Sequence, residues 1–335
     1  MSEPLLEVSQ LAVGFDTDEG PVHAVNDISF TLREGEALAI VGESGSGKSV
    51  TALSIMGLVP SPPGRVDAGS VRYKGRELLG ASERDLRRIR GREIAMIYQD
   101  PMTSLNPALT VGRQITEIVR HHLGLDRRQA ADRAAELLTL VGIPNAAGRL
   151  GEHPHQFSGG QRQRILIAMA LSCDPAVLIA DEPTTALDVT VQAQIIELVK
   201  DLRERLGMAI VWITHDLGVV AGLVDKVTVM YSGYAVEQAP LRELFAQPSH
   251  PYTVGLLRSL PTFGGDRRRL TPIPGSPPDQ ARRVESCPFA PRCDWVIDRC
   301  REEFPALAGV APDHGVACHR RDEVRDTPPL AAAAP

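Results

Sequence analysis

The amino-acid sequence predicts an α/β fold, in which helices flank a mostly parallel sheet and a small irregular extension follows. Over the first 240 or so residues, short β-rich runs alternate with longer helical patterns, which favours parallel strands joined by helices. A glycine-rich segment at residues 42–49 lies between an apolar run and a helical pattern. After residue 240, proline and glycine become frequent, and four of the five cysteines fall between residues 287 and 318. We therefore expect a core at residues 1–240, an extension at residues 241–325 and a disordered tail at residues 326–335.

Individual segments of the core can be assigned in order. Residues 5–8 and 22–32 indicate antiparallel starting strands, and the apolar run at residues 37–41 indicates a buried strand. A helix is expected to begin at about residue 50. Residues 110–141 show helical periodicity without strand signals, so we expect a helical subdomain at about residues 100–165, inserted into the core. Further strands are expected at residues 94–98, 177–180, 209–213 and 226–231.

The composition limits the classes of function. Of the 335 residues, 43% are hydrophobic and 23% are charged, which is ordinary for a soluble globular protein. The net charge of −6 gives no basic field, so nucleic acid is not an expected partner. The N-terminus lacks a secretory signal, and apolar runs such as residues 165–171 are too short to cross a bilayer. We expect a cytoplasmic protein that reaches a membrane only through a partner.

The segment Gly42-Glu43-Ser44-Gly45-Ser46-Gly47-Lys48-Ser49 satisfies the pattern of a phosphate-binding loop, G-x-x-x-x-G-K-[ST]. Its glycines allow backbone N–H groups to turn toward an anion, and the following helix adds the positive end of its dipole. Lys48 is expected to reach the β- and γ-phosphates of a nucleotide, and the Ser49 hydroxyl to ligate Mg²⁺. The pattern thus predicts a P-loop core that binds ATP through residues 42–49 and Val50.

Two acidic residues follow the expected strand at residues 177–180. Asp181 is expected to hold Mg²⁺, because a carboxylate at a strand end beside a phosphate loop is placed for that role. Glu182 is expected to act as the general base that polarises the attacking water. As an isolated pair, these acids could equally cap a turn.

A second anion-binding segment, Ser158-Gly159-Gly160-Gln161, precedes a helical pattern. One nucleotide rarely needs two such segments in one chain. We therefore expect this segment to close over the nucleotide bound by a second, homologous ATPase subunit. The simpler alternative is that Ser158 is only the N-cap of a helix.

The order of these motifs resembles that of the ATP-binding subunits of ABC transporters. Residues 42–49 are similar to Walker A, residues 158–161 to the signature motif, and Asp181-Glu182 to the end of Walker B. The resemblance implies that Gln99 contacts Mg²⁺ and the attacking water, that residues 186–188 form the D-loop, and that His215 contacts the γ-phosphate. It also implies that Phe15 stacks on adenine.

Later motifs narrow the resemblance to the peptide/nickel importer family. They are Gln99 to Pro107, His250-Pro-Tyr-Thr253, Pro274 to Pro278, and a series of cysteines beginning with Cys287-Pro-Phe. The resemblance implies an ATP-hydrolysing subunit at the cytoplasmic face of the membrane, which powers uptake of dipeptides or oligopeptides. It further implies two permease subunits and an extracytoplasmic solute-binding protein as partners. Import of nickel or another small solute is the alternative, and a soluble ABC ATPase is a weaker one.

The cysteines of the extension, Cys287, Cys293, Cys300 and Cys318, are soft ligands that suit iron–sulfur clusters or zinc. No tight Cys-x-x-Cys pair occurs, and the looser loops favour a [4Fe–4S] cluster. Zinc and the absence of any metal remain alternatives. Cys173 is expected to be a small buried residue rather than a further ligand.

Overall fold

The computed structural model describes residues 3–100, 104–260, 272–279, 281 and 283–326. The chain divides into two compact units, and each is taken separately below. The first unit comprises residues 1–32, 37–79 and 214–335, and the second comprises residues 33–36 and 80–213. The predicted tail, residues 326–335, lies outside the described residues apart from Asp326.

The first unit begins with an antiparallel sheet of strands in the order β2-β1-β4-β5. Strands β1 and β2 pair as predicted, but both are longer than the apolar patterns indicated, and β4 was not predicted. The bounds are β1 Leu6–Thr17, β2 Gly20–Leu32, β4 Gly64–Tyr73 and β5 Arg76–Glu77.

A second run of strands in the first unit has the order β11-β12-β10-β9-β3. All five residues of β3 are buried, and β3 pairs with β9 in parallel, which explains why its sequence is apolar without alternation. The other pairs in this run are antiparallel. The bounds are β3 Ala37–Val41, β9 Lys226–Tyr231, β10 Tyr234–Pro240, β11 Ala308–Ala311 and β12 His314–Val316.

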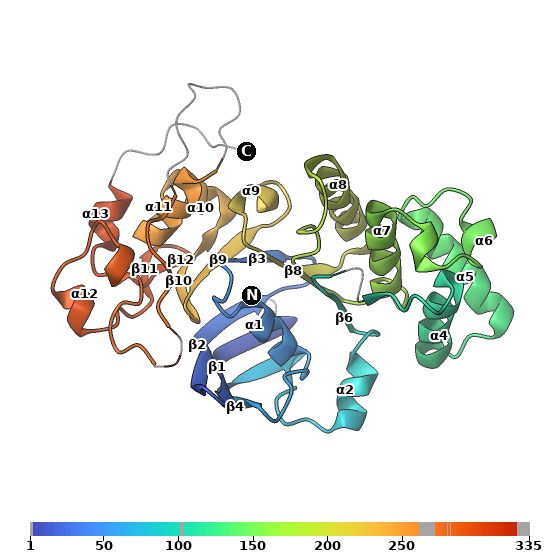
Figure 1. Cartoon of the computed structure of the whole chain (residues 1–335), viewed down its shortest axis with the longest axis horizontal. Helices are drawn as coiled ribbons and strands as arrows, with labels where there is room; N and C mark the ends of the chain where they lie inside the picture. The colour runs from blue at the N-terminus through green and yellow to red at the C-terminus, as the bar shows by residue number, and fades with distance from the viewer. Residues whose placement is uncertain (1–2, 101–103, 261–271, 280, 282, 327–335) are drawn as a thin grey trace. The chain divides into compact units, whose positions relative to one another are not determined.

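The extension is more regular than predicted, because its buried residues add to this sheet. Strand β12 pairs with β10, and Val316 is fully buried. Helix α10 packs against β10 and β9 (Figure 1), and Tyr252 of α11 is fully buried. The helices of the first unit are α1 Lys48–Ile55, α9 Leu217–Val220, α10 Leu241–Ala246, α11 Pro251–Arg258, η2 Ala290–Arg292, α12 Arg299–Glu302 and α13 Arg321–Arg325.

The second unit contains parallel strands in the order β8-β7-β6. Residues 110–141 are helical without a strand, as predicted, and the resulting helices α4 and α5 pack on each other and on α7 (green in Figure 1). Its strands are β6 Ile94–Ile97, β7 Val177–Asp181 and β8 Ala209–Thr214. Its helices are α2 Glu83–Ile89, α4 Val111–Leu123, α5 Arg127–Leu140, α6 Ala146–Arg149, η1 Pro154–Gln156, α7 Gly159–Ala170 and α8 Val189–Leu206.

Candidate functional site

The phosphate loop joins β3 to α1, and two of its glycines, Gly42 and Gly47, stand where a side chain does not fit. A Cβ atom on Gly42 would lie 2.2 Å from the Met230 carbonyl oxygen, and one on Gly47 would lie 2.3 Å from the Ala24 carbonyl oxygen. Gly47 is also left-handed, with a φ of 96°, and it is the N-cap of α1 without a side-chain cap. The helix therefore begins at Lys48, two residues earlier than predicted, and its N-cap residue contributes no side-chain hydrogen bond to the first turn.

Lys48 and Ser46 lie inside this loop. The Lys48 ammonium is buried and donates to the carbonyl oxygens of Gly42 and Glu43, at 2.8 and 2.9 Å. The buried Ser46 hydroxyl makes no hydrogen bond to any described residue. Ser44 and Gly45 are exposed, whereas Ser49 and Val50 are partly buried on α1. A cation, a hydroxyl and a helix N-terminus thus converge in one loop, as anion binding requires.

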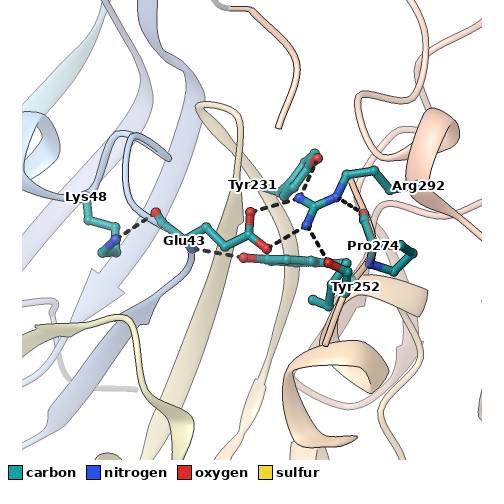
Figure 2. A network of polar contacts seen from close by, with 7 residues as sticks. Glu43, Lys48, Tyr231, Tyr252, Pro274 and Arg292 are labelled. Atoms are coloured by element: carbon teal, nitrogen blue, oxygen red, sulfur yellow. Dashed lines mark hydrogen bonds and ion pairs between the residues drawn. The ribbon is translucent and has the colours of Figure 1, made fainter. Parts of the chain in front are cut away.

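The Glu43 side chain does not belong to this group of anion-binding atoms. Its carboxylate is held by Arg292 of the extension, and its backbone N–H donates to the Tyr252 hydroxyl (Figure 2). Sequence reasoning placed Glu43 in the loop but assigned no role to Arg292 or Tyr252. Tyr252 lies in the His-Pro-Tyr-Thr motif and Arg292 directly precedes Cys293. The sequence therefore pointed to both segments but not to their contact with the loop.

In the second unit, Gln99 and Glu182 come together at the carboxyl ends of β6 and β7. Glu182 Oε2 accepts hydrogen bonds from Thr185 Oγ1, at 2.9 Å, and from Gln99 Nε2, at 3.3 Å. Glu182 has a φ of 46°, a conformation that is strained for a residue with a side chain, and its N–H donates to the Ile213 carbonyl. Asp181 ends β7 and is buried. The sequence did not identify Thr185 as a partner of Glu182.

The signature segment forms a capping box at the start of α7. Ser158 Oγ accepts from the Gln161 N–H at 3.3 Å, and Gln161 Oε1 accepts from the Ser158 N–H at 3.1 Å. Ser158 is therefore the N-cap of α7. Gly159 is exposed, while a Cβ on Gly160 would lie 2.7 Å from Val191 Cγ1.

Two further predicted residues lie in the first unit. His215 is exposed just after β8, and the following Asp216 caps α9. Phe15 is partly buried on β1, next to the backbone of Gly64. The phosphate loop, Phe15 and His215 thus belong to the first unit, whereas Gln99, Asp181, Glu182 and residues 158–161 belong to the second.

The four cysteines of the extension lie in one region of the first unit. Burial raises the pKa of the Cys293 thiol to about 11 and that of Cys318 to about 12, and the charges of neighbouring cysteines add to both shifts. The N–H groups of Trp295 and Arg320 point to the sulfurs of Cys293 and Cys318, each at 3.3 Å. The Cys287 N–H donates to the Cys300 carbonyl at 3.0 Å. Cys173 is buried elsewhere, as predicted.

The expected metal site is not supported by this geometry. Within the described residues, no three histidine, cysteine, aspartate or glutamate side chains converge closely enough to hold a metal ion. The described part of the chain also contains no helix that is long and apolar enough to span a membrane.

Comparisons with known proteins agree with the geometry of the site. Residues 25–185 match the ABC transporter family, and residues 236–300 match the family described as oligopeptide/dipeptide transporter, C-terminal region. A protein of Brucella abortus, named as a peptide import ATP-binding protein, is 54% identical over 91% of this chain and 92% of its own length. A protein of Sinorhizobium fredii, named as a peptide ABC transporter ATP-binding protein, is 51% identical over 96% of both chains.

A solved structure is similar to the core of the chain. It is a dimeric ATP-binding cassette in a post-hydrolysis state bound to ADP and phosphate, and it is 27% identical with a TM-score of 0.63. The match covers 71% of this chain and 99% of the cassette. The chain belongs to the ABC transporter ATP-binding proteins, in the group that carries the oligopeptide/dipeptide transporter C-terminal region.

Proposed function

We propose that this chain is the ATP-hydrolysing subunit of a membrane importer of dipeptides or oligopeptides. The observation that carries the proposal is the phosphate loop, in which Gly42 and Gly47 approach the backbone too closely for a side chain. Gly47 is also the N-cap of α1 and supplies no side-chain cap to the helix. The family matched by residues 236–300 and the names of the relatives support peptide as the solute.

In this function, residues 42–50 bind the phosphates of ATP through backbone N–H groups and Lys48. The Lys48 ammonium exchanges its contacts with the Gly42 and Glu43 carbonyls for contacts with phosphate oxygens. Ser49 and Asp181 would supply oxygen ligands of the kind that Mg²⁺ prefers, and the bound ion would offset the negative charge of the phosphates. Phe15 provides an aromatic face for adenine.

Glu182 is the general base for the attack of water on the γ-phosphate. Thr185 and Gln99 both contact Oε2 of this carboxylate, which supports a fixed orientation for it. Glu182 takes the proton of the water as the new bond to the γ-phosphorus forms, and Gln99 orients that water. The bond from the γ-phosphorus to the β–γ bridging oxygen breaks at the same time, and ADP leaves with that oxygen. His215 contacts the γ-phosphate and helps to keep the attack in line.

Hydrolysis takes place between two ATP-binding subunits. The signature residues Ser158 to Gln161 close over the nucleotide held by the phosphate loop of a homologous partner, and the dimeric form of the similar cassette supports this arrangement. Closure on ATP and opening after hydrolysis drive two permease subunits, which receive peptide from an extracytoplasmic binding protein. The chain then lies at the cytoplasmic face of the membrane, attached through the permeases.

The proposed domains are an ATP-binding domain at residues 1–240 and an extension at residues 241–325. Within the extension, Cys287, Cys293, Cys300 and Cys318 are proposed to hold a [4Fe–4S] cluster. Their shared region and the two N–H···S contacts support this assignment, because thiolate ligands of clusters accept such contacts. A four-iron cluster is larger than a single ion, so its thiolates need not converge as closely as those around zinc.

The catalytic proposal is tested with Glu182→Gln in the assembled transporter. We expect the variant to bind ATP but to release phosphate about 10²- to 10⁴-fold more slowly, because the general base is lost. Glu197→Gln, which changes an exposed glutamate of α8, is the matched control. Turnover at the wild-type rate in Glu182→Gln would remove Glu182 from this role. Uptake of labelled peptide into proteoliposomes that contain the assembled transporter tests whether peptide is the transported solute.

The cluster is tested by analysis of iron, sulfide and zinc in protein purified without oxygen. We expect iron and sulfide with a broad visible absorption, all lost in Cys287→Ser and Cys293→Ser but retained in Cys173→Ser. Zinc, or neither metal, would contradict the proposal.

A further inference from the structure

The extension contacts the phosphate loop directly through an ion pair. Arg292 presents two nitrogens to the two carboxylate oxygens of Glu43, with Nη1···Oε2 at 2.8 Å and Nη2···Oε1 at 3.1 Å (Figure 2). The two residues are 249 positions apart in the sequence. The Arg292 side chain is only 6% exposed and that of Glu43 is 26% exposed. This two-point geometry fixes both the position and the plane of the Glu43 carboxylate.

Arg292 is itself held in place by its surroundings. Its Nε donates to the Pro274 carbonyl at 2.8 Å, and its Nη1 donates to the Tyr231 hydroxyl at 3.1 Å. The guanidinium also lies over the rings of Tyr231 and Phe289, with centroid distances of 5.7 and 5.9 Å. Arg292 is therefore a pre-organised partner for Glu43 rather than a mobile surface charge.

A second contact from the extension reaches the backbone of the same residue. The Glu43 N–H donates to the Tyr252 hydroxyl at 2.9 Å, and Tyr252 is fully buried. Its ring packs against Tyr231 and Phe289, with centroid distances of 4.7 and 5.4 Å. The extension thus holds Glu43 by both its side chain and its main chain, while the Glu43 carbonyl accepts from Lys48.

The charge of Glu43 matters for a loop that binds phosphates. An unpaired carboxylate next to Gly42 would repel an anionic nucleotide, and a low local dielectric would strengthen that repulsion. Arg292 neutralises this charge and at the same time fixes the backbone between Gly42 and Ser44. Loss of Arg292 removes both effects without touching a group that meets the nucleotide.

We propose that Arg292 is a positioning residue for ATP binding, which acts through Glu43 to hold and neutralise the phosphate loop. The extension then contributes to nucleotide binding, because its Arg292 holds the phosphate loop. The proposal rests on the phosphate-binding role given to residues 42–50 under the proposed function.

The test measures KM for MgATP and kcat in the assembled transporter, and binding of MgATP to the full-length chain. We expect Arg292→Ala to raise KM about tenfold, the size of a typical coupling between sites, and to change kcat less. Adding Glu43→Gln to Arg292→Ala should return KM to within about threefold of wild type, because the unpaired charge is gone. The defect of Arg292→Ala should also shrink as ionic strength rises from about 0.1 to 0.5 M. Arg292→Lys, which keeps the charge but loses the two-point contact, should be intermediate.

Arg299→Ala is the matched control. Arg299 also precedes a cysteine of the extension, but it is 63% exposed and pairs with Glu303. An unchanged KM in folded Arg292→Ala, an equal rise in Arg299→Ala, or no rescue by Glu43→Gln would each overturn the proposal. Lys48→Ala tests the phosphate-binding role of residues 42–50 independently of Arg292. If this variant still binds MgATP, the phosphate loop does not have that role.

Discussion

Glu237 of β10 lies fully buried with its Oε1 atom 2.8 Å from Nε2 of His314, which is equally buried on β12. The same carboxylate accepts hydrogen bonds from the backbone N–H groups of Ser249 and His250, at 2.7 and 3.0 Å. One side chain of the sheet therefore binds both β12 and the start of α11. Because α11 carries Tyr252, Glu237 also supports the helix that contacts the phosphate loop.

Replacement of Glu237 should destabilise the extension strongly. In Glu237→Ala, three buried donors lose their acceptor, and each costs about 1–3 kcal/mol when left unsatisfied. We expect the free energy of unfolding to fall by at least about 3 kcal/mol, measured by chemical denaturation. Glu243→Ala, at an exposed position of α10, is the control and should change stability little. Equal effects of the two substitutions would show that the hydrogen bonds of Glu237 do not stabilise the extension.

Stability should depend on pH through His250. Burial lowers the pKa of His250 to about 3, and its Nδ1 accepts the Tyr252 N–H at 3.1 Å. The folded chain keeps this ring neutral, whereas the unfolded chain takes up a proton below a pH of about 6.5. The contribution of His250 to the free energy of unfolding is thus fully present above about pH 6.5. Below that pH, the free energy of unfolding falls by about 1.4 kcal/mol per pH unit as the pH approaches 3.

The measurement compares wild type with His250→Asn, which can still cap α11 but does not titrate. Between about pH 6.5 and 5, the free energy of unfolding of wild type should fall about 2 kcal/mol further than that of the variant. Parallel curves for the two proteins would contradict the assignment of this pH dependence to His250.

Alanine substitutions at Gly42 and Gly75 should distinguish the effect of steric crowding from the effect of backbone strain. Gly42→Ala places a Cβ 2.2 Å from the Met230 carbonyl, so the loop must shift, and affinity for MgATP should fall more than about tenfold. Gly75, in the turn between β4 and β5, has a φ of 74° and open space around its Cβ position. Gly75→Ala should cost about 1–2 kcal/mol of stability from strain and leave the affinity for nucleotide unchanged. Comparable affinities in the two variants, by fluorescence titration, would argue against a tight loop at Gly42.

The sequence predicted the parts of the site that depend on local spacing. The phosphate loop, the strand before it and the helix after it follow from residues 37–56, because the turn, the glycines and the lysine must be consecutive. The helix start was displaced by two residues, since the left-handed Gly47 ends the loop and frees Lys48 to begin α1.

The contacts that hold the site from a distance could not be predicted in the same way. Arg292 and Glu43 carry no shared pattern, and only folding brings them together. The strands of the extension were missed because β11 and β12 are short and their pairing with β10 depends on buried residues far apart in sequence. Thr185 was missed because a threonine in a turn has many ordinary uses.

Substitutions at the two signature glycines, Gly159 and Gly160, should distinguish a role in packing within the chain from a role in contact with a second cassette. A Cβ on Gly160 would lie 2.7 Å from Val191 Cγ1. Among the described residues beyond its neighbours and the backbone of its own helix, the nearest atom to a Cβ on Gly159 is Leu187 Cδ2, at 3.9 Å. Gly160→Ala should therefore lose stability that Val191→Ala partly restores. Gly159→Ala should fold as well as wild type, because its methyl group would make only an ordinary contact, with Leu187, among the residues that the structure describes.

The consequence for hydrolysis is different for Gly159→Ala. If residues 158–161 close over the partner's nucleotide, the added methyl group pushes the signature segment away from the phosphates, and hydrolysis should slow by about a hundredfold. Binding of MgATP to the single chain should be unchanged, because that chain's own phosphate loop is intact. Phosphate release by complexes that carry the substitution in both cassettes decides the matter. A wild-type rate there would mean that no second cassette uses this segment, and the two-cassette site would have to be abandoned.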